Sequence, residues 1–315
     1  MKDMAAIIHR VARGKHGHEH LSREEARAAM EVLLADDADP LQLGAFLIAQ
    51  RMKGETSPEL AGFVEAARRM IDDYGSLQMS PTAVDLPCYA GKRRAAHVHL
   101  ASALVARDQG IPVVVHGLQD IADRADAWQV LLRAGVRRAA TLTEGKQILD
   151  ADGIVYLDVA DLCPPLHRLL KLRPRLGVRS FANTVARLLN PLSCPAQING
   201  FFHTPYAQYM AQANVLLGQS RSLVFMGAEG EPELYADRQK VLLSQGGDSV
   251  CALAYPDAGA APYPKQGIEP ARIVCRFDAL LAGDADAREQ ATLGRMEQAF
   301  RFAAHGTQPE GWTEV

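Results

Sequence analysis

Basic side chains are concentrated in two stretches of this 315-residue chain that contain no aspartate or glutamate. Residues 162–228 carry seven Lys or Arg and residues 86–107 carry four, although the whole chain has 34 Lys+Arg, 37 Asp+Glu and a net charge of −3. The remaining segments are therefore strongly acidic, and the asymmetry predicts a positive face on an acidic molecule. Such a face favours a phosphate-rich partner such as a nucleic acid, and scatter of these residues over a solvated surface is the alternative.

The two stretches supply the residues that we predict to contact phosphate groups: Lys92, Arg93, Arg94, Arg168, Lys171, Arg173, Arg175 and Arg179. Three histidines in or near the stretch 86–107, His97, His99 and His116, would add positive charge below about pH 6.5. Tyr89 would stack on an unpaired base. A solvated turn at 92–94, and ion pairs of Arg173 and Arg179 with distant acids, are the alternatives. Base-specific contacts are not predicted, because the sequence has no helix-turn-helix, zinc-finger or RNP signature.

The composition is that of a globular protein, with 48% hydrophobic and 23% charged residues. No apolar run reaches the ~18 residues of a membrane span, and the N-terminus has no secretory pattern. The five cysteines are odd in number and lack CxxC spacing, so we expect reduced thiols and neither a disulfide framework nor a zinc site. These features predict a cytoplasmic protein without a membrane partner.

The N-terminal residues 1–75 show the patterns of helices. Ser22 followed by Glu25 predicts a capping box, Pro40 opens the next helix, and Ser57-Pro58 predicts the start of a third. Residues 83–89 and 111–117 are strand-like runs separated by a helical pattern, which implies a parallel sheet. Further strands are predicted at 153–160, 198–203, 222–230 and 248–255, and further helices at 165–189, 204–219 and 286–304.

This order predicts an α/β protein with two interleaved domains. A small helical domain would comprise residues 1–80 with 164–190 and mediate dimerisation, and a larger α/β domain with a mainly parallel central sheet would comprise 81–163 with 191–315. A ligand cleft is expected between them, at the carboxyl ends of the strands.

Several motifs resemble those of anthranilate phosphoribosyltransferase in order and spacing. They are RMKGET at 51–56, RPRLGVRSFANTVARLLNP at 173–191 and Gln-Ile-x-Gly at 197–200. The resemblance covers nearly the whole chain and implies the nucleoside-phosphorylase class II fold, with a homodimer formed through the helical domain. It also implies that Arg173 stands at the position that contacts anthranilate.

The resemblance fails at the motifs that bind phosphate and metal. In the family, a GTGGD loop binds the diphosphate, and glycines let its backbone N–H groups approach the ligand. Here the loop is Cys88-Tyr89-Ala90-Gly91-Lys92. The Asn-Ile-Ser-Thr segment is replaced at 97–100, KHGNR at 115–119, and the Asp-Glu pair that holds Mg²⁺ by Pro232-Glu233. These losses predict that the fold is kept for something other than phosphoribosyl transfer.

We therefore predict a vestigial ligand cleft whose remnants are Cys88, Tyr89, Gly91, His97, His99, His116, Gly117 and Glu233. No metal site and no cofactor is predicted. His97-x-His99 lacks a third metal ligand. For Cys88 a buried thiol is favoured over a nucleophile, since nearby histidines are the only identifiable bases.

The losses are similar to those in the YbiB-type branch of the family, whose members bind nucleic acid as homodimers without the synthase activity. That branch has a basic, glycine-poor loop and a Cys-Pro-Pro before a basic helix, as at 92–94 and 163–165 here. The resemblance implies a protein that binds DNA or RNA with little sequence preference in the groove between the domains, and that is not an enzyme.

Two alternatives stay open. The first is a phosphoribosyltransferase for an unidentified aromatic or heterocyclic acceptor, in which Glu233 and Asp85 would hold Mg²⁺. The second is a sensor that binds a nucleotide-like ligand in the cleft.

Overall fold

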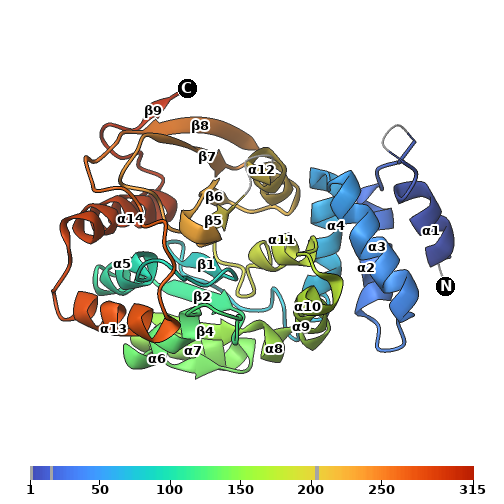
Figure 1. Ribbon diagram of the computed structural model, residues 1–315, viewed down its shortest axis with the longest axis horizontal. Coiled ribbons are helices and arrows are strands. Elements are labelled where there is room, and N and C mark those ends of the chain that lie inside the picture. The colour runs from blue at the N-terminus through green and yellow to red at the C-terminus, as the bar shows by residue number, and fades with distance from the viewer. Residues whose placement is uncertain (1–2, 15–16, 203–205) are drawn as a thin grey trace.

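Four amphipathic helices form a layer at one end of the molecule (Figure 1). They are α1 (Met4–Val11), α2 (Arg23–Leu34), α3 (Pro40–Lys53) and α4 (Ser57–Arg68) in a computed structural model that describes residues 3–14, 17–202 and 206–315. The predicted capping box of Ser22 and Glu25 is present. α4 differs from the prediction, because Thr56 rather than Ser57 is its cap and pairs with Glu59 in a second capping box.

A nine-stranded sheet forms the body of the molecule, in the strand order β3-β4-β2-β1-β5-β6-β7-β8-β9. The strands from β3 to β6 in this order are parallel, and β7 to β9 are antiparallel. Their bounds are β1 (Val84–Cys88), β2 (Val113–Gly117), β3 (Arg138–Ala139), β4 (Ile154–Asp158), β5 (Ala196–Phe201), β6 (Arg221–Met226), β7 (Lys240–Gly246), β8 (Ser249–Tyr255) and β9 (Thr313–Glu314). The predicted fold class is confirmed.

Helices cover the sheet, as the right-handed crossovers of a parallel sheet require. They are α5 (Val98–Asp108), α6 (Ala127–Arg133), α7 (Leu142–Asp152), α12 (Tyr206–Leu216), α13 (Pro270–Leu281) and α14 (Ala287–His305). α14 and α13 both pack on α5, and α12 packs on α4 of the helical layer. Within the described residues, no helix is both long and apolar enough to cross a membrane.

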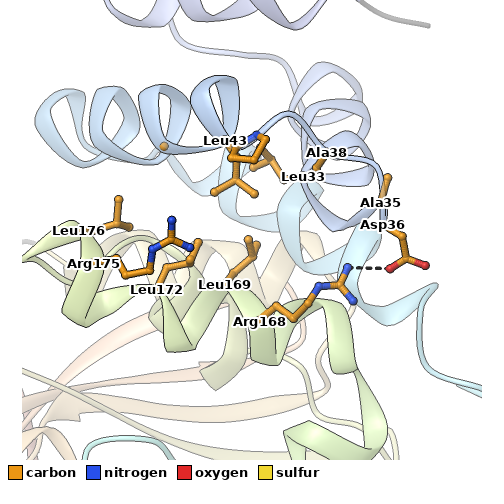
Figure 2. A pocket seen from close by; sticks show the side chains of 12 residues that line it. Leu33, Ala35, Asp36, Ala38, Leu43, Arg168, Leu169, Leu172, Arg175 and Leu176 are labelled. Carbon is orange, nitrogen blue, oxygen red and sulfur yellow. Dashed lines mark ion pairs between the residues drawn. The ribbon is translucent and has the colours of Figure 1, made fainter.

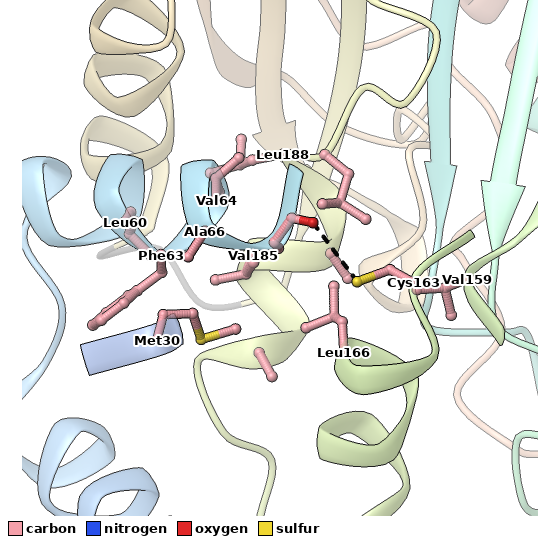
Figure 3. Close-up of a cluster of buried hydrophobic side chains, with 14 of the residues drawn as sticks. Met30, Leu60, Phe63, Val64, Ala66, Val159, Cys163, Leu166, Val185 and Leu188 are labelled. Carbon is pink, nitrogen blue, oxygen red and sulfur yellow. Dashed lines mark hydrogen bonds between the residues drawn. The ribbon is translucent and has the colours of Figure 1, made fainter. Parts of the chain in front are cut away.

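After β4 the chain returns to the helical layer through α8 (Val159–Leu162), α9 (Pro164–Lys171), α10 (Arg173–Leu176) and α11 (Ala182–Arg187). α9 packs on α2, and α11 packs on α4. Their shared core contains Phe63, Leu166 and Val185, and the buried Cys163 thiol donates to the Ala67 carbonyl at 3.7 Å (Figure 3). This packing fixes α9–α11 opposite the sheet edge.

Parallel strands place their carboxyl ends at one edge, and this edge faces α9–α11. Cys88 at the end of β1 is paired in register with Gly117 of β2, which is paired with Asp158 of β4. Loops that follow these strands therefore meet the helical layer, where ligand sites of α/β folds lie. The strand predicted at 198–203 and the helix predicted at 204–219 include residues 203–205, which lie outside the described residues.

Candidate functional site

A cationic cleft of about 390 Å³ lies between the loops after β1 and β2 and the helices α9–α11. Five basic residues line it: Arg93, Arg124, Lys171, Arg173 and Arg179. Two exposed acids, Asp120 and Asp123, lie in the same lining. The cleft therefore carries a net positive charge, which comes from Lys171, Arg173 and Arg179 on the α9–α11 wall, because the two acids balance Arg93 and Arg124 on the loop wall.

Most of these cations have no acidic partner. Within the described residues, the side chains of Arg93, Lys171, Arg173 and Arg179 form no ion pair, and Lys171 donates to the Gln119 carbonyl at 3.1 Å. Burial, and then the charges of Arg187, Arg173 and Arg124, lower the pKa of Arg179 to about 10. An anion in the cleft would relieve this repulsion.

Two further arginines support the cleft, and the sequence analysis did not select them. Arg124 donates to the Gly91 carbonyl at 2.9 Å and lies 3.8 Å from the Glu229 carboxylate. The buried Arg187 donates to the Asn183 carbonyl at 2.6 Å. Arg124 stands between acids in the sequence, so its charge gave no local signal, whereas Arg187 belongs to the acid-free stretch.

The loop after β1 retains a cradle of backbone N–H groups, but a carboxylate of the protein fills it. Ala90 N–H donates to Glu231 Oε1 at 2.9 Å, and Gly91 N–H donates to the same oxygen. Gly91 has φ +66°, a conformation that favours glycine and aligns the two N–H groups. Glu231 thus occupies the backbone N–H groups of the loop to which the resemblance assigns a diphosphate.

A second carboxylate, from the short helix η1 (Ala228–Gly230), binds the rest of this loop. Glu229 accepts hydrogen bonds from the backbone N–H groups of Arg93 at 3.0 Å and Arg94 at 3.1 Å, and from the Tyr263 hydroxyl at 2.8 Å. Glu229 has φ +58°, an unfavourable conformation that these bonds stabilise. Alternating acids at 229, 231 and 233 after a strand were the signal that sequence reasoning missed.

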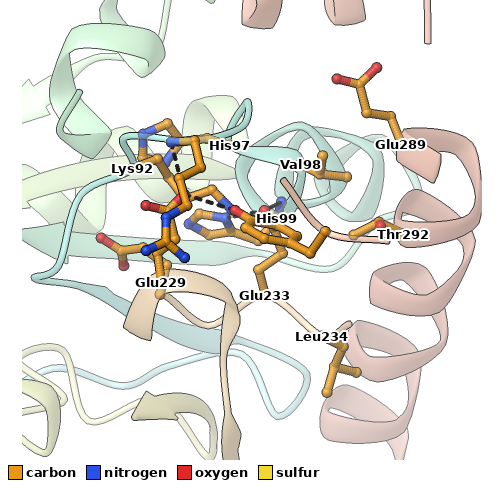
Figure 4. A network of polar contacts seen from close by, with 12 residues as sticks. Lys92, His97, Val98, His99, Glu229, Glu233, Leu234, Glu289 and Thr292 are labelled. Carbon is orange, nitrogen blue, oxygen red and sulfur yellow. Dashed lines mark hydrogen bonds and ion pairs between the residues drawn. The ribbon is translucent and has the colours of Figure 1, made fainter. Parts of the chain in front are cut away.

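Lys92 and Glu233 form a buried ion pair beneath the loop, with Nζ and Oε1 2.5 Å apart (Figure 4). Both side chains are at most 1% exposed, and Glu233 also binds His99 Nδ1 at 3.0 Å. Burial would raise the pKa of Glu233, but Lys92 and His99 outweigh it and hold the pKa well below its usual range. The prediction that Lys92 contacts phosphate is therefore wrong, because its ammonium group is enclosed. The alternative interpretation, a solvated turn at 92–94, is also wrong for Lys92, because its side chain is buried.

Arg168 and Arg175 lie outside the cleft, so the structure corrects their predicted placement too. They line a separate groove between α9–α10 and the α2–α3 segment, beside Leu43 and Leu172 (Figure 2). Arg168 pairs with Asp36 at 2.9 Å and donates to the Leu34 carbonyl. Arg94 is half-buried and does not line the cleft.

Tyr89 does not offer its face to a base, contrary to the prediction. It is 2% exposed, and its hydroxyl lies 2.8 Å from His116 Nδ1. On its other side, His116 Nε2 lies 3.2 Å from Asp85 Oδ2, which also accepts from Gln197 at 2.7 Å. These side chains form an internal polar chain below the cleft.

The predicted remnants Cys88, His97, His99 and Gly117 are buried around the same loop. His97 Nε2 lies 2.9 Å from the Ala125 carbonyl, and burial together with the charges of His99 and Lys92 lowers its pKa well below the usual range. His97 therefore stays uncharged as the pH falls through 6.5, which corrects the prediction that it adds positive charge there. Burial and Glu231 raise the pKa of Cys88, in keeping with a thiol rather than a thiolate nucleophile. At Gly117 a Cβ atom would lie 2.5 Å from the Cys88 carbonyl oxygen, so the two strands require glycine there.

The acids that the phosphoribosyltransferase alternative assigns to Mg²⁺ do not fit that ion. Both oxygens of Glu233 bind protein cations or N–H groups. Asp85 binds His116 and Gln197 through Oδ2, and its buried Oδ1 has no hydrogen-bond partner among the described residues. Mg²⁺ usually keeps several waters and bridges carboxylates to substrate phosphates. Two fully buried carboxylates, one of them bonded through both oxygens, do not suit such an ion.

Comparison with known proteins agrees with the fold and the motifs. Residues 5–70 match the glycosyl transferase family helical bundle domain, and residues 81–258 match its a/b domain. The chain is 31% identical over 240 residues to Escherichia coli YbiB, which is described as uncharacterized, covering 76% of this chain and 74% of YbiB. It is 29% identical over 290 residues to the anthranilate phosphoribosyltransferase of Geobacillus kaustophilus, covering 89% and 82% of the two chains.

A solved structure extends the likeness to three dimensions. The anthranilate phosphoribosyltransferase of Thermus thermophilus superposes with a TM-score of 0.78 at 25% identity, covering 98% of this chain and 90% of that one. The chain belongs to the glycosyl transferase family that has this helical bundle and a/b domain, with YbiB and anthranilate phosphoribosyltransferases among its homologues.

Proposed function

We propose that the cationic cleft binds nucleic acid, DNA or RNA, as a single strand and with little sequence preference. The observation that carries the proposal is the set of four basic side chains that line the cleft, Arg93, Lys171, Arg173 and Arg179, and form no ion pair with any described carboxylate. A cavity of about 390 Å³ has the size of a small-ligand site, so one strand enters it, whereas a duplex would lie across its mouth. Contacts to phosphate give affinity without reading sequence.

The filled cradle supports this proposal over phosphoribosyl transfer. A diphosphate donor would have to displace Glu231 from the N–H groups of Ala90 and Gly91. It would also approach the carboxylate of Glu229, whereas that of Glu233 is neutralised by Lys92. The cost of displacing Glu231 opposes binding of a diphosphate in the cradle, but Arg173 and Arg179 line the cleft outside the cradle.

Phosphoribosyl transfer is the second candidate, because relatives with that name cover most of the chain and because Arg173 matches the position implied to contact anthranilate. It predicts diphosphate release from phosphoribosyl diphosphate in the presence of Mg²⁺ and an aromatic acceptor. We expect no release with anthranilate. Release that depends on Arg173 would favour the enzyme and contradict the leading proposal.

The experiment for the leading proposal is a fluorescence-anisotropy titration of labelled single-stranded oligonucleotides with the full chain at low salt. We expect binding of DNA and RNA of mixed sequence, with affinity that rises with strand length until the cleft is filled. Unlabelled duplex is expected to compete less well than the single strand. If the duplex competed as well as the single strand, the nucleic acid would lie across the mouth of the cleft and not inside it. If no oligonucleotide bound, the proposal would be overturned.

We further propose that the protein is a homodimer through α3. Four apolar residues of this helix, Leu41, Ala45, Ile48 and Met52, recur at helical spacing and are exposed, with Leu41 at 81% and Met52 at 80%. The resemblance implies a dimer through the helical domain, and a second copy would cover this stripe. Size-exclusion chromatography with light scattering is expected to give a dimer for the wild type and a monomer for Leu41→Asp/Met52→Asp. A monomeric wild type would contradict the assignment.

A further inference from the structure

Three metal-ligating side chains converge behind the loop that follows β1. The Sγ atom of Cys88, an imidazole nitrogen of His99 and a carboxylate oxygen of Glu231 lie within 4.8 Å of one another, and all three residues are buried. Cys88 ends β1, His99 lies in the first turn of α5, and Glu231 follows η1. The cluster therefore joins three separate elements of the fold.

The imidazole of His99 is oriented as a metal ligand requires. Its Nδ1 lies 3.0 Å from Glu233 Oε2, and a carboxylate accepts, so Nδ1 is the donor in this contact and Nε2 is the nitrogen left for a metal ion. The lone pair of Nε2 then points into the cluster, where Cys88 Sγ lies 3.7 Å away. A carboxylate that holds the outer nitrogen of a ligating histidine is a common feature of zinc sites.

One carboxylate oxygen in the cluster has no partner. Glu231 Oε1 accepts the N–H groups of Ala90 and Gly91, but its Oε2 is buried and makes no hydrogen bond with any described residue. The Cys88 thiol, a weak donor, interacts with the Glu231 carboxylate and also contacts the Leu86 carbonyl at 3.7 Å. A buried, unbonded carboxylate oxygen is costly, which indicates a missing cation or donor.

We propose that Cys88, His99 and Glu231 bind a divalent transition-metal ion of the zinc class. Binding of the ion would displace the proton of the Cys88 thiol, and the resulting thiolate would neutralise the charge of the ion together with the Glu231 carboxylate. For bond lengths of about 2.3 Å to sulfur and 2.0–2.1 Å to nitrogen, a tetrahedral angle places the two ligand atoms about 3.6 Å apart. The observed 3.7 Å between Cys88 Sγ and His99 Nε2 meets this requirement.

The ligand set also selects the type of metal. Thiolate and imidazole suit Zn²⁺ or Co²⁺ and not Mg²⁺, which prefers oxygen ligands. Three protein ligands leave one tetrahedral position, and within the described residues no fourth thiol, imidazole or carboxylate belongs to the group. The ion would fasten the η1 turn to the ends of β1 and α5, and this inference does not depend on the proposed function.

Cobalt binding to the full chain tests this inference. After removal of metals with a chelator, Co²⁺ is titrated and the spectrum is recorded, with the metal content measured by mass spectrometry. We expect about one ion per chain with a thiolate-to-Co²⁺ charge-transfer band. Cys88→Ser is expected to lose the band and His99→Asn to weaken binding at least tenfold.

Two control variants separate this site from surface binding. Cys251→Ser removes an exposed thiol, and His18→Ala/His20→Ala removes two neighbouring surface imidazoles; both are expected to keep the band. Absence of a thiolate band in the folded wild type would overturn the inference even if Cys88→Ser failed to fold. A band that survives in Cys88→Ser would overturn it too. Oligonucleotide affinity is not a readout here, so this result and that of the proposed function are independent.

Discussion

Replacing both Arg173 and Arg179 with glutamate is expected to weaken binding of a single-stranded oligonucleotide by at least about a hundredfold. A hydrogen bond to a charged group contributes about 1.5–3 kcal/mol, and each 1.4 kcal/mol is about a factor of ten. Both side chains line the cleft and form no ion pair with the described residues, so the substitutions break no ion pair of the folded protein. Fluorescence anisotropy at fixed low salt measures the change.

Arg301→Glu is the control for charge, since on α14, far from the cleft, it makes the change of −2 that each of the two cleft substitutions makes. The Arg301 side chain is 61% exposed and pairs with Glu297 on the same helix. We expect its effect on affinity to be less than about threefold, in line with the small contribution of surface charges. If the control lost as much oligonucleotide affinity as the Arg173/Arg179 variant, net charge alone would drive binding, and the cleft would not be the binding site.

The substitution Lys92→Met is expected to destabilise the protein by about 3–5 kcal/mol, because it leaves the Glu233 carboxylate buried without its main counter-ion. Urea denaturation followed by circular dichroism measures the loss. Oligonucleotide affinity of the folded variant is expected to stay within about twofold of wild type, since the ammonium group is enclosed. A large loss of oligonucleotide affinity with unchanged stability would show instead that Lys92 contacts the nucleic acid.

The double variant Lys92→Met/Glu233→Gln distinguishes the ion pair from simple packing. Removing both charges is expected to restore most of the lost stability. The pH dependence follows from the pKa of Glu233, which Lys92 and His99 hold below its usual value of 4.5 despite burial. Its contribution is present above about pH 4.5 and is lost as the pH falls through the folded-state pKa, so the double variant is expected to lose less stability on acidification. Equal acid sensitivity would contradict this assignment.

The sequence was sufficient to predict the layers of the fold but not all elements within them. Capping at Ser22 and the apolar runs of β1, β2 and β4 are local signals that tertiary contacts reinforce. The helix Leu142–Asp152 was not predicted, because few of its residues are apolar and its start depends on the Thr141 cap. The strand Lys240–Gly246 was missed because pairing with β6 and β8, rather than its own pattern, defines it.

The candidate site was predicted as a region, and its details were not. Three consecutive basic residues look equivalent in the sequence, yet Arg93 is exposed, Arg94 is half-buried and Lys92 is enclosed. The turn at Gly91 and the bridge of Lys92 with Ala125 direct Lys92 inward, toward a glutamate 141 residues away. No local pattern carries that information. The role of Glu231 is hidden in the same way, because it lies about 140 residues from the loop that it binds. The loop sequence alone suggests that the cradle of N–H groups is lost, whereas the structure shows it filled by Glu231.

The dependence of oligonucleotide affinity on salt tests the central claim most directly. Four unpaired cations in the cleft predict that log K falls against log salt with a slope of about −3, since each phosphate contact with a single strand contributes about −0.7. The Arg173→Glu/Arg179→Glu variant is then expected to have a slope nearer −1.5. A slope near zero, or a slope that the variant leaves unchanged, would contradict binding of a phosphate chain in this cleft.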